Sequence, residues 1–492
     1  MSAEPTMNTS NAPAGGGDLA ARNRLVILIL LVSAFVVILN ETIMVVALPR
    51  LMDDLGVTAN AVQWLTTAFM LTMAVVIPVT GFLLQRLNTR PVFILAMSTF
   101  AAGTTICAVS PGLELLIVGR VVQACGTAIM MPLLMTTVMN LVPPENRGKT
   151  MGDISLVISV APALGPTVSG LILNVLDWRW IFIVVVPIAL AALYFGWRRM
   201  VNVTTPRYAP VDVVSVILSV FAFGGIVYGL SLMGEGGEAA TPVPAWVPVV
   251  VGGVALVVFI LRQLLLQKRD QALLDLRTFL SKTFSLSIFM MAVFMMAMFG
   301  VFVLLPIYLQ NVLGLETLQI GLLLLPGGLT MGILARYVGR LYDRFGPTVL
   351  VVPGSAVVCM VLWSLTFMDQ NTSPLFVLAA HVVLSVGLAF LFTPLFTASL
   401  GSLPPHLYSH GSAVLGTIQQ VAGAAGVALF VALMSLRSSA ELAAGAPEPV
   451  ALSAGIQLAF QAGAIISVLT VLAAFLIRRP EPAGVPAEAA GH

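Results

Sequence analysis

Long apolar runs separated by short polar segments extend along almost the whole chain. A helix needs about 20 consecutive apolar residues to cross a bilayer, and we count fourteen candidate runs, of which 180–197 is short but is followed by Arg198 and Arg199. The first run reaches Leu48, which is too long for the apolar part of a signal peptide. The pattern therefore predicts an all-α polytopic membrane protein with 14 transmembrane helices. We expect these helices to begin near residues 25, 61, 91, 113, 150, 180, 212, 245, 284, 318, 347, 375, 411 and 454.

The composition supports this class and argues against several others. Of the 492 residues, 59% are hydrophobic and 9% are charged, whereas about 25% of the residues of a soluble domain are charged. A net charge of +2 gives no electrostatic basis for a nucleic-acid partner. The three cysteines lack metal-ligand spacing, and hydrolase, zinc-protease and nucleotide-binding motifs are absent from the sequence. We expect no enzyme activity, no metal and no cofactor.

The basic residues predict the orientation, because Lys and Arg gather in cytoplasmic loops. With the N-terminus inside, the inner segments hold 19 of the 23 basic residues. Arg50, Arg179 and Arg437 fall in outer loops, and Arg120 falls inside a helix. We therefore predict a multi-pass protein of the cell (plasma) membrane with both termini in the cytoplasm. The inner residues are Arg22, Arg24, Arg86, Arg90, Arg147, Lys149, Arg198, Arg199, Arg207, Arg262, Lys268, Arg269, Arg277, Lys282, Arg336, Arg340, Arg344, Arg478 and Arg479.

Two segments indicate an internal repeat. "PVTGFLLQRLNTRP" (78–91) and "RYVGRLYDRFGPT" (336–348) both follow an apolar helix and enter a basic loop. The positions of these two segments in the chain favour two parallel six-helix halves with two additional helices between them, a 6 + 2 + 6 arrangement. We expect a disordered tail over 1–24, the first half over 25–200, the additional helices and linkers over 201–283, the second half over 284–478, and a cytoplasmic tail over 479–492.

Further motifs occur on the predicted helices. They are "LNETIMVVALP" (39–49), "GRVVQACGTA" (119–128), "APALGPTVSG" (161–170), "WRWIF" (178–182) and "TPLFTASLGSLPPHLYSHGSAVLGTIQQVAGAAG" (393–426). With the repeat, they make the chain resemble the major facilitator superfamily from Leu25 to Arg479, in its fourteen-span drug:proton antiporter branch. The last two look most like Gram-positive multidrug and lincomycin-resistance exporters. The resemblance implies the major facilitator fold.

The resemblance also implies gating and motif residues, with some departures. These residues are Gly81, Arg86, Gly165, Pro166, Gly170, Gly339, Asp343 and Arg344. The loop after the second helix has Gln85 where the family has an aspartate and Asn88 where it has a glycine, whereas the copy in the second half keeps its acid. In the first helix the usual acidic position holds Asn40, and the carboxylate is one place later at Glu41. One residue turns about 100° around a helix, so Glu41 is expected to face differently.

Glu41 and Arg120 are the candidate proton-coupling residues. If the first helix ends at Leu48, Glu41 lies seven residues from its outer end, roughly 10 Å deep. Arg120 lies equally far into a helix that begins at Leu113, and the resemblance implies that both helices line a central cavity. Burial favours a neutral carboxyl group and a nearby guanidinium favours a charged one, so a change of access could load and release a proton. The alternative is a structural ion pair, or a carboxyl group kept protonated by packing.

Other polar and flexible side chains are candidates for contact with the substrate. Each has a structural alternative: tight packing, a core or lipid-facing methionine, or a hydrogen-bonded histidine. Asp153 and Asp212 lie near helix starts, where an acid is favourable by itself. The substrate candidates are Asn40, Gln123, Met291, Met295, His381, Gln419 and Gln420.

These observations predict a secondary active transporter. We expect a proton-coupled multidrug exporter of amphipathic or cationic toxic compounds, working by alternating access and functional as a monomer in the lipid bilayer. Its partners would be small-molecule substrates and protons. An exporter of a dedicated metabolite or lipid is the alternative within transport, and a non-transporting receptor or scaffold is the alternative of another class.

Overall fold

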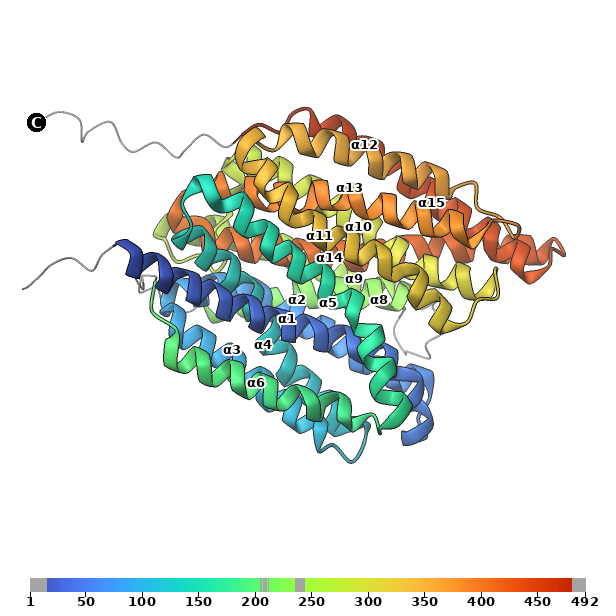
Figure 1. Cartoon of the computed structure of the whole chain (residues 1–492), viewed down its shortest axis with the longest axis horizontal. Helices are drawn as coiled ribbons and strands as arrows, with labels where there is room; N and C mark the ends of the chain where they lie inside the picture. Colours follow the sequence, from blue (N-terminus) through green and yellow to red (C-terminus); the bar gives the residue numbers. More distant parts are fainter. Residues whose placement is uncertain (1–15, 204–205, 207–209, 211, 235–243, 480–492) are drawn as a thin grey trace, which may run out of the picture.

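A computed structural model describes residues 16–203, 206, 210, 212–234 and 244–479. These residues include 14 helices that are long and apolar enough to cross a membrane, as predicted. Figure 1 shows them as one bundle. Within the described residues they are formed by fifteen α-helical segments, because α7 and α8 belong to one span. The segments are α1 (Gly16–Leu55), α2 (Ala59–Arg86), α3 (Thr89–Ala108), α4 (Leu113–Leu141), α5 (Arg147–Val175), α6 (Arg179–Arg199), α7 (Val213–Ser219), α8 (Gly225–Gly234), α9 (Trp246–Leu266), α10 (Lys282–Asn311), α11 (Thr317–Phe345), α12 (Thr348–Leu365), α13 (Pro374–Gly401), α14 (Tyr408–Ala443) and α15 (Glu448–Ala474).

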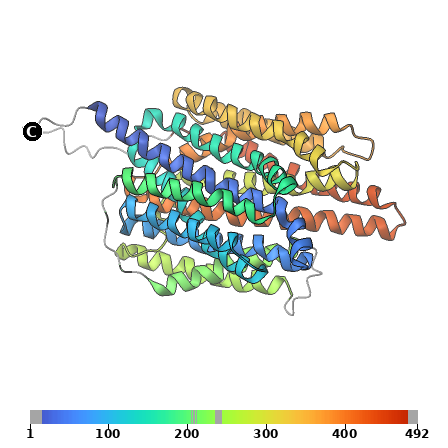
Figure 2. The ribbon, with the colours of Figure 1, turned by 60° about the horizontal axis from the view of Figure 1, so that its bottom comes forward.

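Helix contacts fall into two groups, and a short pair of helices packs beside them. In the first group α3 packs on α4 and α6, α1 on α5, and α2 on α4. In the second group α14 packs on α10 and α15, and α13 on α11 and α12. The π-helical turn η2 (Val220–Gly224) joins α7 to α8, and these three segments with α9 form what we call the helix pair. The helix pair is the yellow-green group along the lower edge of Figure 2.

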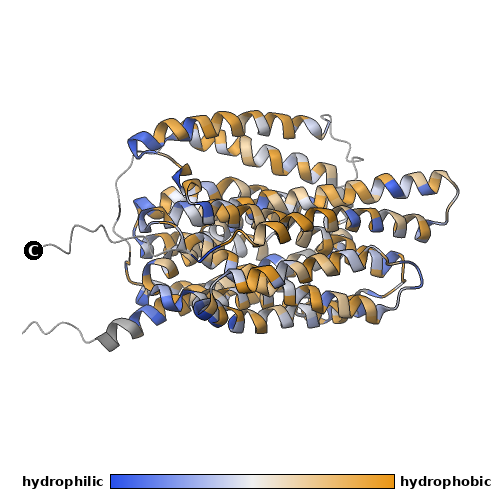
Figure 3. Ribbon diagram, turned by 90° about the horizontal axis from the view of Figure 1, so that it is seen from above, coloured by the Kyte–Doolittle hydropathy of each residue, from blue (hydrophilic) through white to orange (hydrophobic). Residues whose placement is uncertain are grey.

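Polar residues concentrate at the two ends of the bundle, and apolar residues cover its length (Figure 3). The chain enters α1 and leaves α15 at the same end, on the left of Figure 1. Arg147 begins α5, Arg199 ends α6 and Arg344 lies in the last turn of α11 on this side, and Arg479 follows α15 there. We call it the basic end, and the other side the opposite end.

The first helix differs from its prediction at both ends. It begins at Gly16, so residues 16–24 are helical rather than part of a disordered tail. It also continues past Leu48 through Pro49 to Leu55. On this extension Arg50 and Asp54, which are one helical turn apart, form an ion pair (3.6 Å). Glu41 is therefore deeper within its helix than expected. The remaining predicted tail segments, 1–15 and 480–492, lie outside the described residues.

The two halves meet most closely at the basic end, where α5 crosses α11. Glycines allow this approach: a Cβ added to Gly339 would lie 2.1 Å from the Gly148 carbonyl oxygen, and one added to Gly152 would lie 2.5 Å from that of Ala335. Toward the opposite end, a Cβ on Gly170 or Gly321 would meet no described atom within 4 Å. The bundle is thus sealed between its halves at the basic end.

Candidate functional site

Glu41 lies in the middle of α1, half-buried, on a different face from Asn40. No hydrogen bond or ion pair reaches its carboxylate from any described residue. Asn40 is only 1% exposed, and neither atom of its amide has a hydrogen-bond partner in the described part of the chain. Asn40 is therefore enclosed among helices, where we expected it to face a cavity. The turn of about 100° between neighbouring residues separates the two side chains.

Arg120 is held on α4 by several partners within the first half. Its side chain is 1% exposed, its Nε donates to the Leu65 carbonyl (3.3 Å), and its Nη1 donates to Gln123 Oε1 (2.6 Å). The guanidinium also lies 4.0 Å from the centre of the Phe69 ring. A buried cation is costly unless it is paired or hydrogen-bonded, and these contacts offset that cost without a carboxylate.

Gln123 orients Arg120 and has little access to any ligand. It is fully buried, and its Nε2 donates to Thr104 Oγ1 (2.8 Å) while its Oε1 accepts from Arg120. Both ends of the amide are therefore occupied. The structure places Gln123 as a positioning residue, where the sequence suggested a substrate contact.

The charges of Glu41 and Arg120 interact, but the two groups do not touch. Their electrostatic interaction spans α1 and α4, which pack together. The ion pairs of the described residues do not include one between them. A structural ion pair, the alternative expected for this position, is thus absent from this conformation, and the residue stays half-buried. An ionisable group in a membrane span that is not neutralised by contact is typical of an ion pathway.

At the basic end, Asp343 joins the halves. Its carboxylate accepts the backbone N–H groups of Gly148 (2.7 Å) and Lys149 (2.8 Å) at the start of α5. Free N–H groups and the helix dipole make this end attractive to an anion. A second contact nearby joins Arg336 to Asp153 (3.1 Å). Asp343 therefore caps a helix of the other half.

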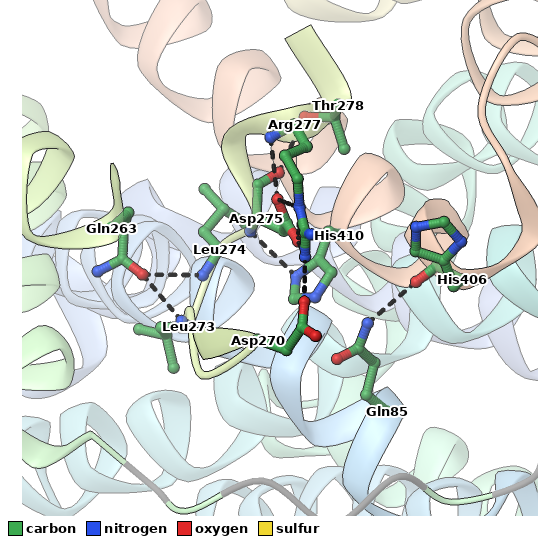
Figure 4. A network of polar contacts seen from close by, with 10 residues as sticks. All are labelled: Gln85, Gln263, Asp270, Leu273, Leu274, Asp275, Arg277, Thr278, His406 and His410. Atoms are coloured by element: carbon green, nitrogen blue, oxygen red, sulfur yellow. Dashed lines mark hydrogen bonds and ion pairs between the residues drawn. The ribbon is translucent and has the colours of Figure 1, made fainter. Parts of the chain in front are cut away.

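Gln85, at the matching place in the first half, makes a different contact. Its Nε2 donates to the His406 carbonyl (3.0 Å), just before α14 (Figure 4). An amide can donate a hydrogen bond where an ionised acid only accepts, so the substitution replaces a helix cap by a bond to a carbonyl oxygen. Gly81 brings α2 close to α14, since an added Cβ would lie 3.1 Å from Ala413 Cβ.

The remaining motif residues vary in their surroundings. A Cβ on Gly165 would lie 2.3 Å from Thr42 Oγ1, so this glycine packs α5 tightly on α1. Pro166 is exposed and Gly170 has open space beside it, whereas Ser169 between them in the chain is fully buried. The Arg344 guanidinium lies 5.1 Å from the Phe345 ring, and Arg86 ends α2 at the basic end.

The other substrate candidates divide into core and half-buried residues. Met291 and Met295 are buried in the hydrophobic core, at 0% and 3% exposure. His381 is half-buried, and Gly327 packs against its ring. Gln419 and Gln420 are half-buried on α14, and the described residues make no hydrogen bond to either amide. These two glutamines are the candidates best able to meet a ligand in this conformation.

Asp212 has a structural role. Its carboxylate caps α7 by accepting from the Ser215 N–H (3.2 Å) and pairs with Arg262 Nε (2.7 Å) and Nη2 (2.8 Å). The hydrogen bonds from Arg262 are the main reason that the pKa of Asp212 falls to about 2. The group therefore stays ionised at neutral pH and cannot exchange protons there.

Two buried hydroxyl pairs across the halves were not foreseen from the sequence. Thr393 donates to Ser155 (2.8 Å) between α13 and α5, and Thr136 and Ser412 are 2.7 Å apart between α4 and α14. Single serines and threonines are common in apolar helices, where they usually bond to their own backbone. The sequence therefore carried no signal that singled out these four.

Comparison with known proteins identifies the family and several relatives of this chain. Residues 30–427 match the Major Facilitator Superfamily. The lincomycin resistance protein LmrB of Listeria monocytogenes is 41% identical over 91% of this chain and 95% of its own length. LmrB of Bacillus subtilis is 38% identical over 92% of this chain and 95% of its own length. The multidrug resistance protein B homolog of Mycobacterium tuberculosis is 28% identical over 80% of this chain and 73% of its own length.

Solved structures with the same fold are more distant in sequence. The human organic anion transporter MFSD10 superposes with a TM-score of 0.67 at 15% identity, covering 92% of this chain and 99% of its own. The proton:xylose symporter XylE superposes with a TM-score of 0.66 at 13% identity, covering 94% and 97%. At these identities the likeness concerns the fold alone.

Proposed function

The chain belongs to the Major Facilitator Superfamily and is a transporter, and we propose that it exports amphipathic or cationic toxic compounds in exchange for protons. The observation that carries the proposal is Glu41, a half-buried acid of α1 that has no ion pair or hydrogen bond among the described residues, on a helix that packs against α4 with Arg120. The names of the lincomycin- and multidrug-resistance relatives support the substrate class.

The proton would be carried by Glu41. When the site is open to the outside, the carboxylate takes up a proton and the substrate leaves. When the site opens to the cytoplasm, Glu41 releases that proton and the next substrate enters. Arg120 favours the charged carboxylate in the empty site, and it repels a cationic ligand once Glu41 is neutral.

The close contacts at the basic end support an outward-facing step of this cycle, if the basic end is cytoplasmic. The concentration of Lys and Arg in its loops supports that orientation and places both termini inside. Contacts of Asp343 with α5, and of Gly339 with Gly148, then seal the cytoplasmic side. Two rocking halves with a site between them are sufficient for transport by one chain, so we propose that the monomer is functional.

The available energy is adequate for export. One proton that moves down about 100 mV supplies about 2.3 kcal/mol, and each unit of pH difference adds about 1.4 kcal/mol. For a neutral substrate, a typical potential and one pH unit together can hold a concentration gradient of several hundredfold at one proton per cycle. Exchange of a monovalent cation for one proton moves no net charge, so one pH unit alone then holds about tenfold.

The test is proton-driven transport in inverted vesicles. A panel of lipophilic dyes and lincomycin-type antibiotics is added to wild type, Glu41→Gln and Glu41→Asp. We expect substrate-evoked loss of the pH gradient in wild type, a reduced response in Glu41→Asp and none in Glu41→Gln. Asp212→Asn is the matched control, because its carboxylate is a structural cap, and it should respond like wild type.

Each alternative predicts a different result. Equal responses of wild type and Glu41→Gln would remove Glu41 from the coupling step. A response to a single metabolite or lipid, with none to the drug panel, would make this a dedicated exporter.

A further inference from the structure

The connector between α9 and α10, residues 267–281, is packed into the protein. It contains two short 3₁₀ helices, η3 (Gln267–Arg269) and η4 (Leu276–Leu280). Loops usually run over the surface, yet Leu273 and Leu274 are 1% and 5% exposed and belong to the hydrophobic core. Burial of this kind indicates that the connector holds its neighbours in place.

Hydrogen bonds fasten the connector to the helix pair. Gln263 of α9 is fully buried, and its Oε1 accepts the N–H groups of Leu273 (2.8 Å) and Leu274 (3.3 Å). Its Nε2 donates to Ser215 Oγ on α7 (2.7 Å). The Asp212 to Arg262 ion pair joins α7 and α9 once more. The two helices and the connector therefore form one unit.

The same connector is fastened to α14 in the second half. The Asp275 N–H donates to Nδ1 of His410, which is 2% exposed in the first turn of α14 (Figure 4). At its end, the Ser281 hydroxyl donates to the Ser402 hydroxyl (2.9 Å), just after α13. Both bonds are directional, and the bond to His410 is buried, where the loss of a partner is costly.

An internal ion pair keeps the connector in shape. The guanidinium of Arg277 binds the Asp275 carboxylate (2.6 Å) and that of Asp270 (2.6 Å). Burial opposes ionisation of Asp275, but hydrogen bonds from the Arg277 side chain and backbone outweigh it and keep the pKa of Asp275 below its usual range. The backbone N–H of Asp275 is thereby presented to His410.

Toward the first half, the helix pair presents apolar surfaces. Trp64 of α2 lies against Tyr228 of α8, with ring centroids 5.9 Å apart. A Cβ on Gly224 would lie 3.3 Å from a methyl group of Val75 on α2. Contacts between rings and methyl groups are less directional than hydrogen bonds, so they can exchange partners as helices slide.

We infer that the second half carries the helix pair during transport, with residues 267–281 as the strap that fastens it, while α2 slides along its apolar face. This inference rests on the alternating access proposed above, but not on protons or on any substrate. His410 and Gln263 are positioning residues in this arrangement: they act by holding the strap.

The test measures distances between spin labels by pulsed electron paramagnetic resonance. The native cysteines Cys107, Cys125 and Cys359 are first replaced by alanine. Labels at the exposed positions Trp246 of α9, Val109 after α3 and Phe367 after α12 report on the helix pair, the first half and the second half. Gly339→Val forces the halves apart at the basic end, because its Cβ would lie 2.1 Å from the Gly148 oxygen.

We expect Gly339→Val to shift the 246–109 distance together with the 109–367 distance, and to leave the 246–367 distance unchanged. A shift of 246–367 with 246–109 constant would overturn the inference, because the first half would then carry the pair. This readout needs no transport, so it is independent of whether Glu41 couples protons.

The strap itself is tested by substitution of its anchor. His410→Leu removes the acceptor for the Asp275 N–H, and the 246–367 distance distribution should broaden. His410→Asn is the matched variant, because its Oδ1 can accept a hydrogen bond near the place of Nδ1, and its distribution should stay narrow. A narrow distribution in both variants would show that His410 does not fasten the strap.

Discussion

The carboxylate of Asp343 on α11 accepts the backbone N–H of Gly148 on α5 at 2.7 Å, so an acid of the second half caps a helix of the first. With the adjacent bond to the Lys149 N–H, this contact exists only while the basic end is closed. It therefore stabilises one conformation of the transporter relative to the other. The first two predictions follow from this contact and from the glycine beside it.

Asp343→Ala should shift the population away from the conformation closed at the basic end. Loss of a helix cap costs about 1 kcal/mol, which corresponds to roughly a fivefold change in population. The measurement is the rate at which a thiol reagent modifies Ser155→Cys, a position that is 3% exposed in the closed form. We expect that rate to rise about fivefold in inverted vesicles.

The control for this prediction is Asp369→Ala. The carboxylate of Asp369 also accepts a backbone N–H, from Asn371 at 2.9 Å, but within a local turn that spans no helix contact between the halves. Its effect on modification of Ser155→Cys should be small. An equal increase with both variants would mean that general loosening, rather than the cap, exposes this position.

Gly339→Ala should prevent full closure of the basic end and reduce transport. The added methyl group would lie 2.1 Å from the Gly148 oxygen, so backbone must move. Gly321→Ala on the same helix is the control, because its methyl group meets no described atom within 4 Å. The initial rate of transport in vesicles should fall at least tenfold for Gly339→Ala and stay near the wild-type rate for Gly321→Ala. Similar transport rates for the two variants would exclude the steric effect.

Gln123→Ala should lower thermal stability. Arg120 would lose its 2.6 Å hydrogen bond, and the Thr104 hydroxyl would lose its donor, in a fully buried site. A buried polar group without its partner costs about 1–3 kcal/mol. Gln419→Ala is the control, since this half-buried amide makes no hydrogen bond to the described residues. Thermal unfolding in detergent should separate the melting temperatures of the two variants by about 1–3 °C, and equal melting temperatures would contradict this role of Gln123.

The sequence predicts the helices well, because a run of apolar residues long enough to cross the membrane has few other folds available. The different faces of Asn40 and Glu41 also follow from helix geometry alone. The resemblance to a known family indicated Gly339 and Asp343, but their contact with α5 needs the packing of distant segments. Nothing in the sequence links His410 to Asp275, because 135 residues separate them and a single histidine on a helix carries no distinctive pattern.

Asp212→Asn should destabilise the protein at neutral pH and have no effect in strong acid. The bonds from Arg262 hold the pKa of Asp212 at about 2, below the value of about 3.9 in an unfolded chain. A lowered pKa means that the stabilisation is complete above about pH 5 and is lost progressively as the pH falls to about 1. Because Arg262 is partly exposed, we expect roughly 1 kcal/mol. Chemical unfolding of wild type and variant at several pH values measures the difference in the free energy of unfolding.

Asp177→Asn is the control. The Asp177 side chain that pairs with Arg179 is nearly half exposed, so the loss of this pair should change the stability little at any pH. A difference between wild type and Asp212→Asn that persists unchanged to pH 2 would show that the carboxylate charge is not its source.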